Sequence, residues 1–218
     1  LMRAGEIEVN PAYSVKGPRM SVTGGKTPAF DADNARKFLE SIDGDTIKDK
    51  RDRALICLMM YSFARISAAL QMDAPDYFQH NDGYHLRINE KGGKVRTLPA
   101  HSALVAAMAE YLEATELRGK PLPLWQTIDR KTSKLSGRRL SRTDAYQMLT
   151  DRAREAGFTE AKYGNHTWRA TGITAFLDGG GAVDLAQQIA GHADPRTTGL
   201  YDRRQDRINQ GEIERIRI

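Results

Sequence analysis

The chain has 218 residues, of which 40% are hydrophobic and 28% are charged, and its 33 Lys and Arg against 28 Asp and Glu give a formal net charge of +5. This length and composition are typical of a soluble, globular protein with a sizeable core. They exclude an integral membrane protein, because the apolar run at residues 54–64 is far shorter than the ~20 residues of a spanning helix. The positive charge is compatible with a polyanionic partner without requiring one.

The single cysteine, Cys57, lies in that apolar run and has no second cysteine with which to form a disulfide in the chain. A reducing, intracellular setting follows, and we expect a cytoplasmic protein. The sequence contains no His and Cys cluster and no carboxylate cluster with the spacing of metal ligands. It therefore predicts neither a metal nor another cofactor.

Residues 1–27 have the composition of a linker, with Pro and Gly but no apolar periodicity. We expect this segment to follow an N-terminal domain that is absent from this sequence, and to lead into a compact domain at residues 28–218. That domain opens with a helix whose N-cap is Asp31 or Asp33. A second helix, at about 48–63, is apolar almost all round in its second half, which predicts a central position.

The apolar period then changes to that of strands. Residues 84–89 and 95–100 alternate in polarity and are joined by Gly92 and Gly93, which predicts an antiparallel hairpin or three-stranded sheet. Residues 118–142 hold eight basic side chains and one acidic one, and we expect them to form a mobile, cationic loop. Further helices are expected at 101–116, 142–156, 167–178, 183–190 and 195–203. The predicted fold class is mainly α with a small antiparallel β-sheet.

Cationic or titratable side chains stand beside turns and element ends at four places, namely Arg65, Lys91, His166 with Arg169, and His192 with Tyr201. Each has an ordinary structural interpretation when taken alone. Arg65 can compensate the C-terminal dipole of an apolar helix. Lys91 can be a solvated turn residue, and His166 can be a polar residue at the start of a helix. Residues 184–204, moreover, have the form of a helix-turn-helix with basic residues on its second helix, which is typical of a DNA-binding regulator.

Taken together, the six residues favour chemistry on a phosphodiester. The arginines, the lysine and the histidines supply positive donors for phosphate oxygens, and a tyrosine hydroxyl is a competent oxygen nucleophile. A regulator that only binds DNA has no need of Lys91 on a hairpin or of Arg65. The set therefore favours metal-free cleavage of DNA over the helix-turn-helix interpretation.

The motifs that carry these residues resemble the catalytic domain of the tyrosine recombinases, the phage-integrase and Xer-like family. They are "ARISAAL" at 64–70, "EKGGKVRTLP" at 90–99, "HTWR" at 166–169, "AGH" at 190–192 and "TTGLYDR" at 197–203. They occur in the family's order, and the resemblance covers the chain from about residue 27 to its end. It implies the recombinase catalytic-domain fold and a site-specific recombinase or integrase of a phage or other mobile element.

By this resemblance, Tyr201 attacks a DNA phosphodiester to form a 3′-phosphotyrosyl bond and a free 5′-hydroxyl, and a second strand reverses the step without ATP. Arg65 and Arg169 hold the non-bridging oxygens as negative charge grows on them. The family also implies roles for the remaining three residues. Lys91 protonates the leaving 5′-oxygen, His166 assists proton transfer at the tyrosine, and His192 donates to the phosphate.

Some positions depart from the commonest family pattern. Ala68 stands three residues after Arg65, where many relatives carry Glu, so the support of that arginine must come from elsewhere in the chain. Trp168 stands where Leu is usual, and Ala170 where His is frequent. Lys94 is a weaker candidate for the leaving-group acid than Lys91, because it follows the glycine pair.

The expected partners are double-stranded DNA and further protomers, with no membrane. Backbone and groove contacts are expected from the cationic segment, at Arg130, Lys131, Lys134, Arg138, Arg139 and Arg142. The apolar residues of the last segment, Ile213, Ile216 and Ile218, are expected to pack on a neighbouring protomer on DNA, as the C-terminal element often does in the family. A type IB topoisomerase-like nicking and closing enzyme is the remaining alternative, because it shares the catalytic residues.

Overall fold

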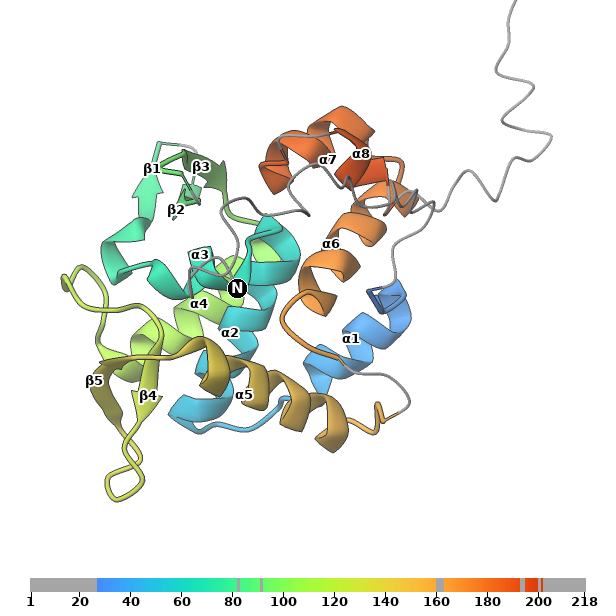
Figure 1. Cartoon of the computed structure of the whole chain (residues 1–218). Coiled ribbons are helices and arrows are strands. Elements are labelled where there is room, and N and C mark those ends of the chain that lie inside the picture. Colours follow the sequence, from blue (N-terminus) through green and yellow to red (C-terminus); the bar gives the residue numbers. More distant parts are fainter. Residues whose placement is uncertain are drawn as a thin grey trace, which may run out of the picture.

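Helices are the predominant secondary structure of the computed structural model, which describes residues 27–81, 83–90, 92–159, 163–192, 195–199 and 201 (Figure 1). They are α1 (Ala32–Glu40), α2 (Ile47–Ser62), α3 (Ile66–Gln71), α4 (Ser102–Thr115), α5 (Arg142–Glu155), α6 (Thr167–Asp178), α7 (Val183–Ala190) and α8 (Pro195–Gly199). The predicted fold class is confirmed. No helix in these described ranges is both long and apolar enough to cross a membrane.

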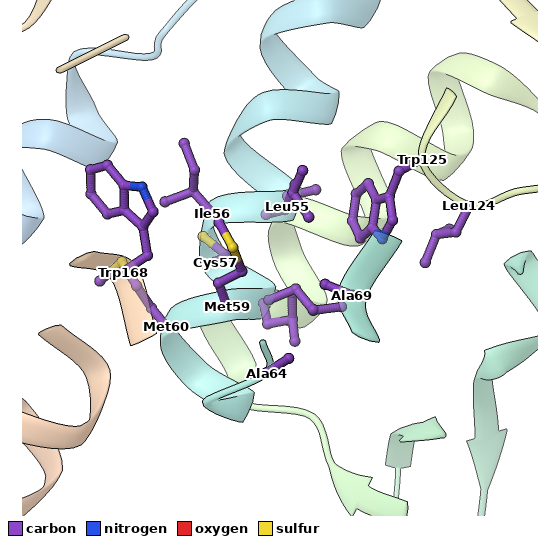
Figure 2. Packing of buried hydrophobic residues seen from close by; sticks show 14 of the residues in the cluster. Leu55, Ile56, Cys57, Met59, Met60, Ala64, Ala69, Leu124, Trp125 and Trp168 are labelled. Atoms are coloured by element: carbon purple, nitrogen blue, oxygen red, sulfur yellow. The ribbon is translucent and has the colours of Figure 1, made fainter. Parts of the chain in front are cut away.

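Helix α2 lies at the centre of the domain, as predicted, and packs against α4 and α6 (Figure 1). It begins at an N-cap threonine, Thr46, whose side chain accepts a hydrogen bond from the Asp49 amide. Side chains on all of its faces are buried in the second half, including Leu55, Ile56 and Met59 (Figure 2). Burial on every face explains why this stretch has no polar side in the sequence.

Helices α2 and α6 approach so closely at Gly172 that a side chain has no room there. A Cβ atom built at Gly172 would lie 1.9 Å from the carbonyl oxygen of Met60. We therefore expect Gly172→Ala to lower the free energy of unfolding by about 1–3 kcal/mol or more, because the helices must separate. Thermal unfolding measures this. Gly199→Ala is the matched control, since nothing lies within 4 Å of a Cβ there, and an equal loss in both variants would contradict the packing argument.

The predicted hairpin belongs to a three-stranded antiparallel sheet. Its strands are β1 (Tyr77–His80), β2 (Gly83–Asn89) and β3 (Val95–Pro99), in the order β1-β2-β3, and a 3-10 helix, η2 (Ala74–Asp76), precedes them. In the β2–β3 register, Leu86 pairs with Leu98 and Ile88 pairs with Arg96. An arginine thus stands at a buried position of the sheet.

The prediction that residues 118–142 form a loop is wrong, because this segment contains a second hairpin. Strands β4 (Gln126–Ile128) and β5 (Leu135–Arg139) pair antiparallel. The fully buried Leu124 and Trp125 anchor the hairpin to the core, and the Gln126 side chain accepts from the Gly137 amide at 2.8 Å. Polar contacts hold this hairpin, so its sequence lacks the apolar alternation by which strands are recognised.

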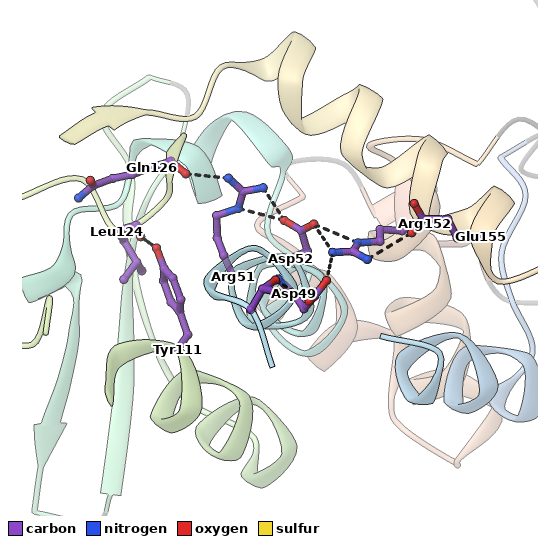
Figure 3. Close-up of polar contacts among 9 residues, drawn as sticks. Asp49, Arg51, Asp52, Tyr111, Leu124, Gln126, Arg152 and Glu155 are labelled. Atoms are coloured by element: carbon purple, nitrogen blue, oxygen red, sulfur yellow. Dashed lines mark hydrogen bonds and ion pairs between the residues drawn. The ribbon is translucent and has the colours of Figure 1, made fainter. Parts of the chain in front are cut away.

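A network of buried charges joins α2 to α5 (Figure 3). The wholly buried Asp52 accepts hydrogen bonds from Arg51 at 2.6 and 2.9 Å and from Arg152 at 3.0 Å. Arg152 also donates to Asp49. Arg51 reaches further and donates to the Gln126 carbonyl at 2.8 Å, which ties β4 to the same network.

The remaining helices agree closely with the sequence. Asp31 caps α1 and Ser141 caps α5, each by accepting from a backbone amide three residues later. Helices α6 and α7 occupy the predicted ranges. Helix α8 ends at Gly199, and the predicted continuation to residue 203 lies outside the described residues apart from Tyr201, as do the linker up to residue 26 and the terminal isoleucines.

Candidate active site

Arg65 stands in the short connection between α2 and α3. Helix α2 ends at Ser62, its C-cap residue Phe63 turns the chain through a left-handed backbone (φ 52°), and Arg65 is the N-cap residue of α3. It also lies two residues after the C-cap of α2, but its guanidinium pairs with Glu90 and not with a carbonyl of that helix. Its side chain is 37% exposed, and Nη1 donates to Glu90 at 2.7 Å. The remaining donors of this guanidinium are thus available at a partly open surface.

Arg169, in the first turn of α6, is almost entirely buried and joins three segments. Its guanidinium donates to the Phe63 carbonyl, to the Ala190 carbonyl at 2.8 Å and to His192 Nε2 at 2.6 Å. Burial and the nearby positive charge of Arg65 lower the pKa of Arg169 to about 10. The two arginines are therefore close enough for their charges to interact, and Arg169 is held in one orientation by carbonyl groups.

His192 follows α7 directly, after Gly191 ends that helix in the left-handed conformation. A guanidinium can only donate, so Nε2 accepts from Arg169 and the proton lies on Nδ1. Nδ1 then donates to the Thr198 hydroxyl at 2.8 Å. Burial and the positive charges of Arg169 and Arg65 lower the pKa of His192 to about 4. The imidazole is therefore neutral at pH 7.

Tyr201 lies directly beside His192. The two ring centroids are 6.3 Å apart with an interplanar angle of 11°, and the Tyr201 amide donates to the Thr198 carbonyl at 3.0 Å. The tyrosine is half-buried and packs against the apolar cluster of α6 and α7. Its phenol lies near enough to Arg169 to raise the pKa of that guanidinium, although burial lowers the same pKa by more. Thr198 thus orders both His192 and the tyrosine.

We expect folding stability to depend on pH through His192. The folded state holds this pKa at about 4, below the ordinary 6.5, so between these values the unfolded chain binds more protons. The contribution of neutral His192 to the free energy of unfolding is therefore fully present above about pH 6.5. It is lost as the pH falls from 6.5 toward 4, because protonation then favours the unfolded chain. Melting temperatures of the wild type and His192→Gln across this range measure it. An identical pH dependence in both proteins would contradict the assignment.

His166 is the N-cap residue of α6 and lies at the surface. Partial burial of its ring and the positive charges of Arg169, Arg142 and Arg65 lower its pKa. His166 therefore shares the electrostatic surroundings of both arginines. The structure thus brings together Arg65, His166, Arg169, His192 and Tyr201, while Lys91 lies outside the described residues.

Three residues of this site were missed in the sequence: Glu90, Arg96 and Thr198. Glu90 accepts from both Arg65 and Arg96, at 2.7 Å each. A signal for the pair exists, because Arg96 falls at an inward position of β3 and Glu90 continues the alternation of β2 one residue past its end, and buried charges require partners. No comparable signal distinguishes Thr198, a fully buried threonine in a polar stretch.

The departures from the family pattern have structural counterparts. Trp168, where Leu is usual, is wholly buried and packs against Phe38 and Phe30, with ring centroids 4.3 and 5.2 Å away. Ala170, where His is frequent, is also wholly buried. The methyl side chain of Ala68 cannot accept a hydrogen bond, and the Arg65 guanidinium donates to Glu90.

Of the six residues expected to contact DNA, five are exposed. Arg130, Lys131 and Lys134 lie in or beside the β4–β5 turn, Arg138 lies on β5, and Arg142 begins α5. Arg139 differs, because its guanidinium donates to the Leu70 carbonyl at 2.7 Å, to the Met72 carbonyl at 2.9 Å and to Asp73. These bonds fix β5 to the segment after α3, so we withdraw Arg139 from the expected DNA contacts.

Comparison with known proteins agrees with this geometry. The profile of the Phage integrase family matches residues 28–207. Tyrosine recombinase XerD of Mycobacterium tuberculosis (strain ATCC 25618 / H37Rv) is 34% identical over 203 residues, which cover 90% of this chain and 62% of that protein. XerC of Alcanivorax borkumensis is 28% identical over 207 residues, which cover 92% of this chain and 63% of that protein. The chain thus spans less than two thirds of these relatives.

Solved structures show the same fold. The XerH site-specific recombinase bound to difH substrate, in a pre-cleavage complex, matches with a TM-score of 0.66 at 24% identity, over 90% of this chain and 55% of that one. A lambda integrase dimer bound to a COC′ core site matches with a TM-score of 0.63 at 13% identity, over 96% of this chain and 70% of that one. At these identities the likeness concerns the fold alone.

Proposed function

Because the chain belongs to the phage integrase family, we propose that it is the catalytic part of a site-specific recombinase or integrase that cleaves and rejoins DNA strands. One observation carries the proposal: Arg169 lies near Arg65 and Tyr201 and contacts His192, whose ring stacks beside the half-buried Tyr201. A phenol nucleophile beside two guanidinium groups suits attack on a phosphodiester.

In the proposed reaction, the Tyr201 oxygen forms a bond to phosphorus as the bond to the 5′-oxygen breaks. The product is a 3′-phosphotyrosyl link and a free 5′-hydroxyl, and the reverse attack by a hydroxyl end rejoins the strand. Arg65 and Arg169 donate to the non-bridging oxygens, on which negative charge grows in the transition state. The number of phosphoester bonds is conserved, so the cycle needs no ATP.

Proton transfers are assigned to the remaining residues. Lys91 is proposed to give a proton to the leaving 5′-oxygen, and His166 to assist proton transfer at the tyrosine. His192 accepts at Nε2 in this structure, so donation to a phosphate requires the tautomer with the proton on Nε2. The Thr198 hydroxyl supports that tautomer as well, because it can donate to Nδ1 at the same 2.8 Å.

A suicide substrate tests this function. A duplex with a nick just beyond the scissile phosphate loses its short 5′-hydroxyl strand after cleavage, so the covalent intermediate accumulates. We expect covalent capture by the wild type and none by Tyr201→Phe. No capture by a folded wild type that binds DNA would favour the non-catalytic helix-turn-helix regulator. Relaxation of supercoiled DNA without pairing of two sites would favour the type IB topoisomerase-like enzyme.

We also propose that exposed cations of the β4–β5 hairpin contact the DNA backbone. Lys131→Gln and Lys134→Gln are each expected to reduce the slope of log K against log salt by ~0.9 for each phosphate that the variant no longer neutralises. Binding measured between low and moderate salt gives the slope. Lys37→Gln on α1 is the matched control, and an equal change in slope for all three variants would contradict a defined contact surface.

We propose that the protein binds double-stranded DNA and assembles on it with further protomers. We also propose that it acts on the nucleoid of a bacterial or phage-infected cell. Packing of Ile213, Ile216 and Ile218 on the neighbouring protomer is proposed to join them. A mostly apolar groove of about 890 Å³ between α1, α2, α4 and α6 supports this, since it offers a receiving surface. Deletion of residues 208–218 is expected to weaken cooperative assembly on two adjacent half-sites and to leave binding to a single half-site unchanged.

A further inference from the structure

Glu90 is a buried carboxylate placed between two arginines. Its side chain is 4% exposed, with Oε2 at 2.7 Å from Arg65 Nη1 and Oε1 at 2.7 Å from Arg96 Nη2. Burial raises the pKa of this carboxyl, but the hydrogen bonds from Arg96 and Arg65 outweigh that effect and hold it below its ordinary value. Glu90 is therefore ionised at neutral pH, and each oxygen serves one guanidinium.

Arg96 holds Glu90 in place. Its side chain is 6% exposed, and Nη1 donates to the Ile189 carbonyl in α7, so β3 is tied to that helix. The next carbonyl, that of Ala190, accepts from Arg169. The contacts that link Arg65, Glu90 and Arg96 thus end at the Ile189 carbonyl, next to the Ala190 carbonyl that orients Arg169.

Arg65, in contrast, has little other support. Among the described residues, Glu90 is the sole hydrogen-bond and ion-pair partner of the Arg65 side chain. Ala68, at the position where many relatives carry Glu, cannot accept a hydrogen bond from it. The positive charge of Arg169 repels this partly exposed guanidinium, and the Glu90 carboxylate opposes that repulsion.

We propose that Glu90 is the positioning residue of Arg65, and that it replaces the carboxylate which this chain lacks at Ala68. The inference rests on the proposed function, in which Arg65 contacts the scissile phosphate. A carboxylate that holds one Nη group fixes the plane of the guanidinium, so that its other donors face the phosphate before the reaction begins. Loss of Glu90 therefore slows the chemical step while leaving contacts to the rest of the DNA intact.

The test is single-turnover cleavage of the suicide substrate at saturating protein. Glu90→Gln keeps the size of the side chain and removes its charge. It is expected to reduce the cleavage rate about tenfold to a hundredfold, by analogy with the loss found when hydrogen-bond partners of metal ligands are removed. The dissociation constant for DNA is expected to change less than about twofold. Glu90→Asp, which retains the carboxylate, is expected to recover part of the rate, which a merely structural role does not predict.

Asp52→Asn is the matched control, because Asp52 is also a buried carboxylate between two arginines but lies away from the site. We expect it to lower the melting temperature and to leave the cleavage rate unchanged at a temperature where it is folded. If the wild type cleaves, either of two results would overturn this inference and leave the proposed function standing. One is that Glu90→Gln cleaves as fast as the wild type, and the other is that Glu90→Asp cleaves no faster than Glu90→Gln. A wild type that captures no DNA overturns the proposed function, and this inference with it.

Discussion

Arg169→Ala is expected to slow covalent cleavage of DNA about a hundredfold to a thousandfold, because it removes a donor directed at the charge that grows in the transition state. The wild-type guanidinium is held by the carbonyls of Phe63 and Ala190, so little reorganisation is needed during the reaction. Loss of the side chain also leaves these carbonyls unpaired, at a cost of about 1–3 kcal/mol of stability each. Cleavage rates are therefore to be measured well below the melting temperature of the variant.

Arg169→Lys separates charge from geometry. Lysine retains the positive charge but cannot donate in a planar fork to two carbonyls and a phosphate at once. We expect its cleavage rate to lie between those of the wild type and Arg169→Ala. Wild-type cleavage by a folded Arg169→Ala protein would contradict the role proposed for this residue.

Asp52→Ala is expected to reduce the free energy of unfolding by about 3–5 kcal/mol. The substitution leaves Arg51, 5% exposed, without its carboxylate partner, and Arg152, 12% exposed, keeps Asp49 but loses Asp52. An uncompensated buried charge is costly. Denaturant unfolding measures the loss. A decrease below about 1 kcal/mol would show that the two arginines find other partners or water.

The helical part of the fold could be predicted well from the sequence, because it follows from local patterns. The second half of α2 is apolar on all sides since it is buried on all sides, and α5 begins at Arg142, where the helix was expected. Short helices and strands were harder. The β4–β5 hairpin is held by side-chain hydrogen bonds of Gln126 and by a turn at Asp129, and such contacts leave no apolar period to recognise.

The candidate site was predicted through residue types at characteristic spacings. Arg65, Arg169, His192 and Tyr201 lie together, although Arg65 and Tyr201 are far apart in the sequence. What the motifs could not reveal is how the site is supported. Glu90 is recognisable as a partner of Arg65 only once strands β2 and β3 are brought beside α3, because that contact depends on tertiary structure and not on a local pattern.

Identification of the amino acid that becomes joined to DNA tests the central claim most directly. The wild-type protein trapped on the suicide substrate is digested with protease and nuclease, and mass spectrometry locates the residue that carries the nucleotide 3′-phosphate. We predict a phosphotyrosyl bond at Tyr201. A nucleotide found on any other residue, or cleavage of the strand with no residue attached, would contradict it.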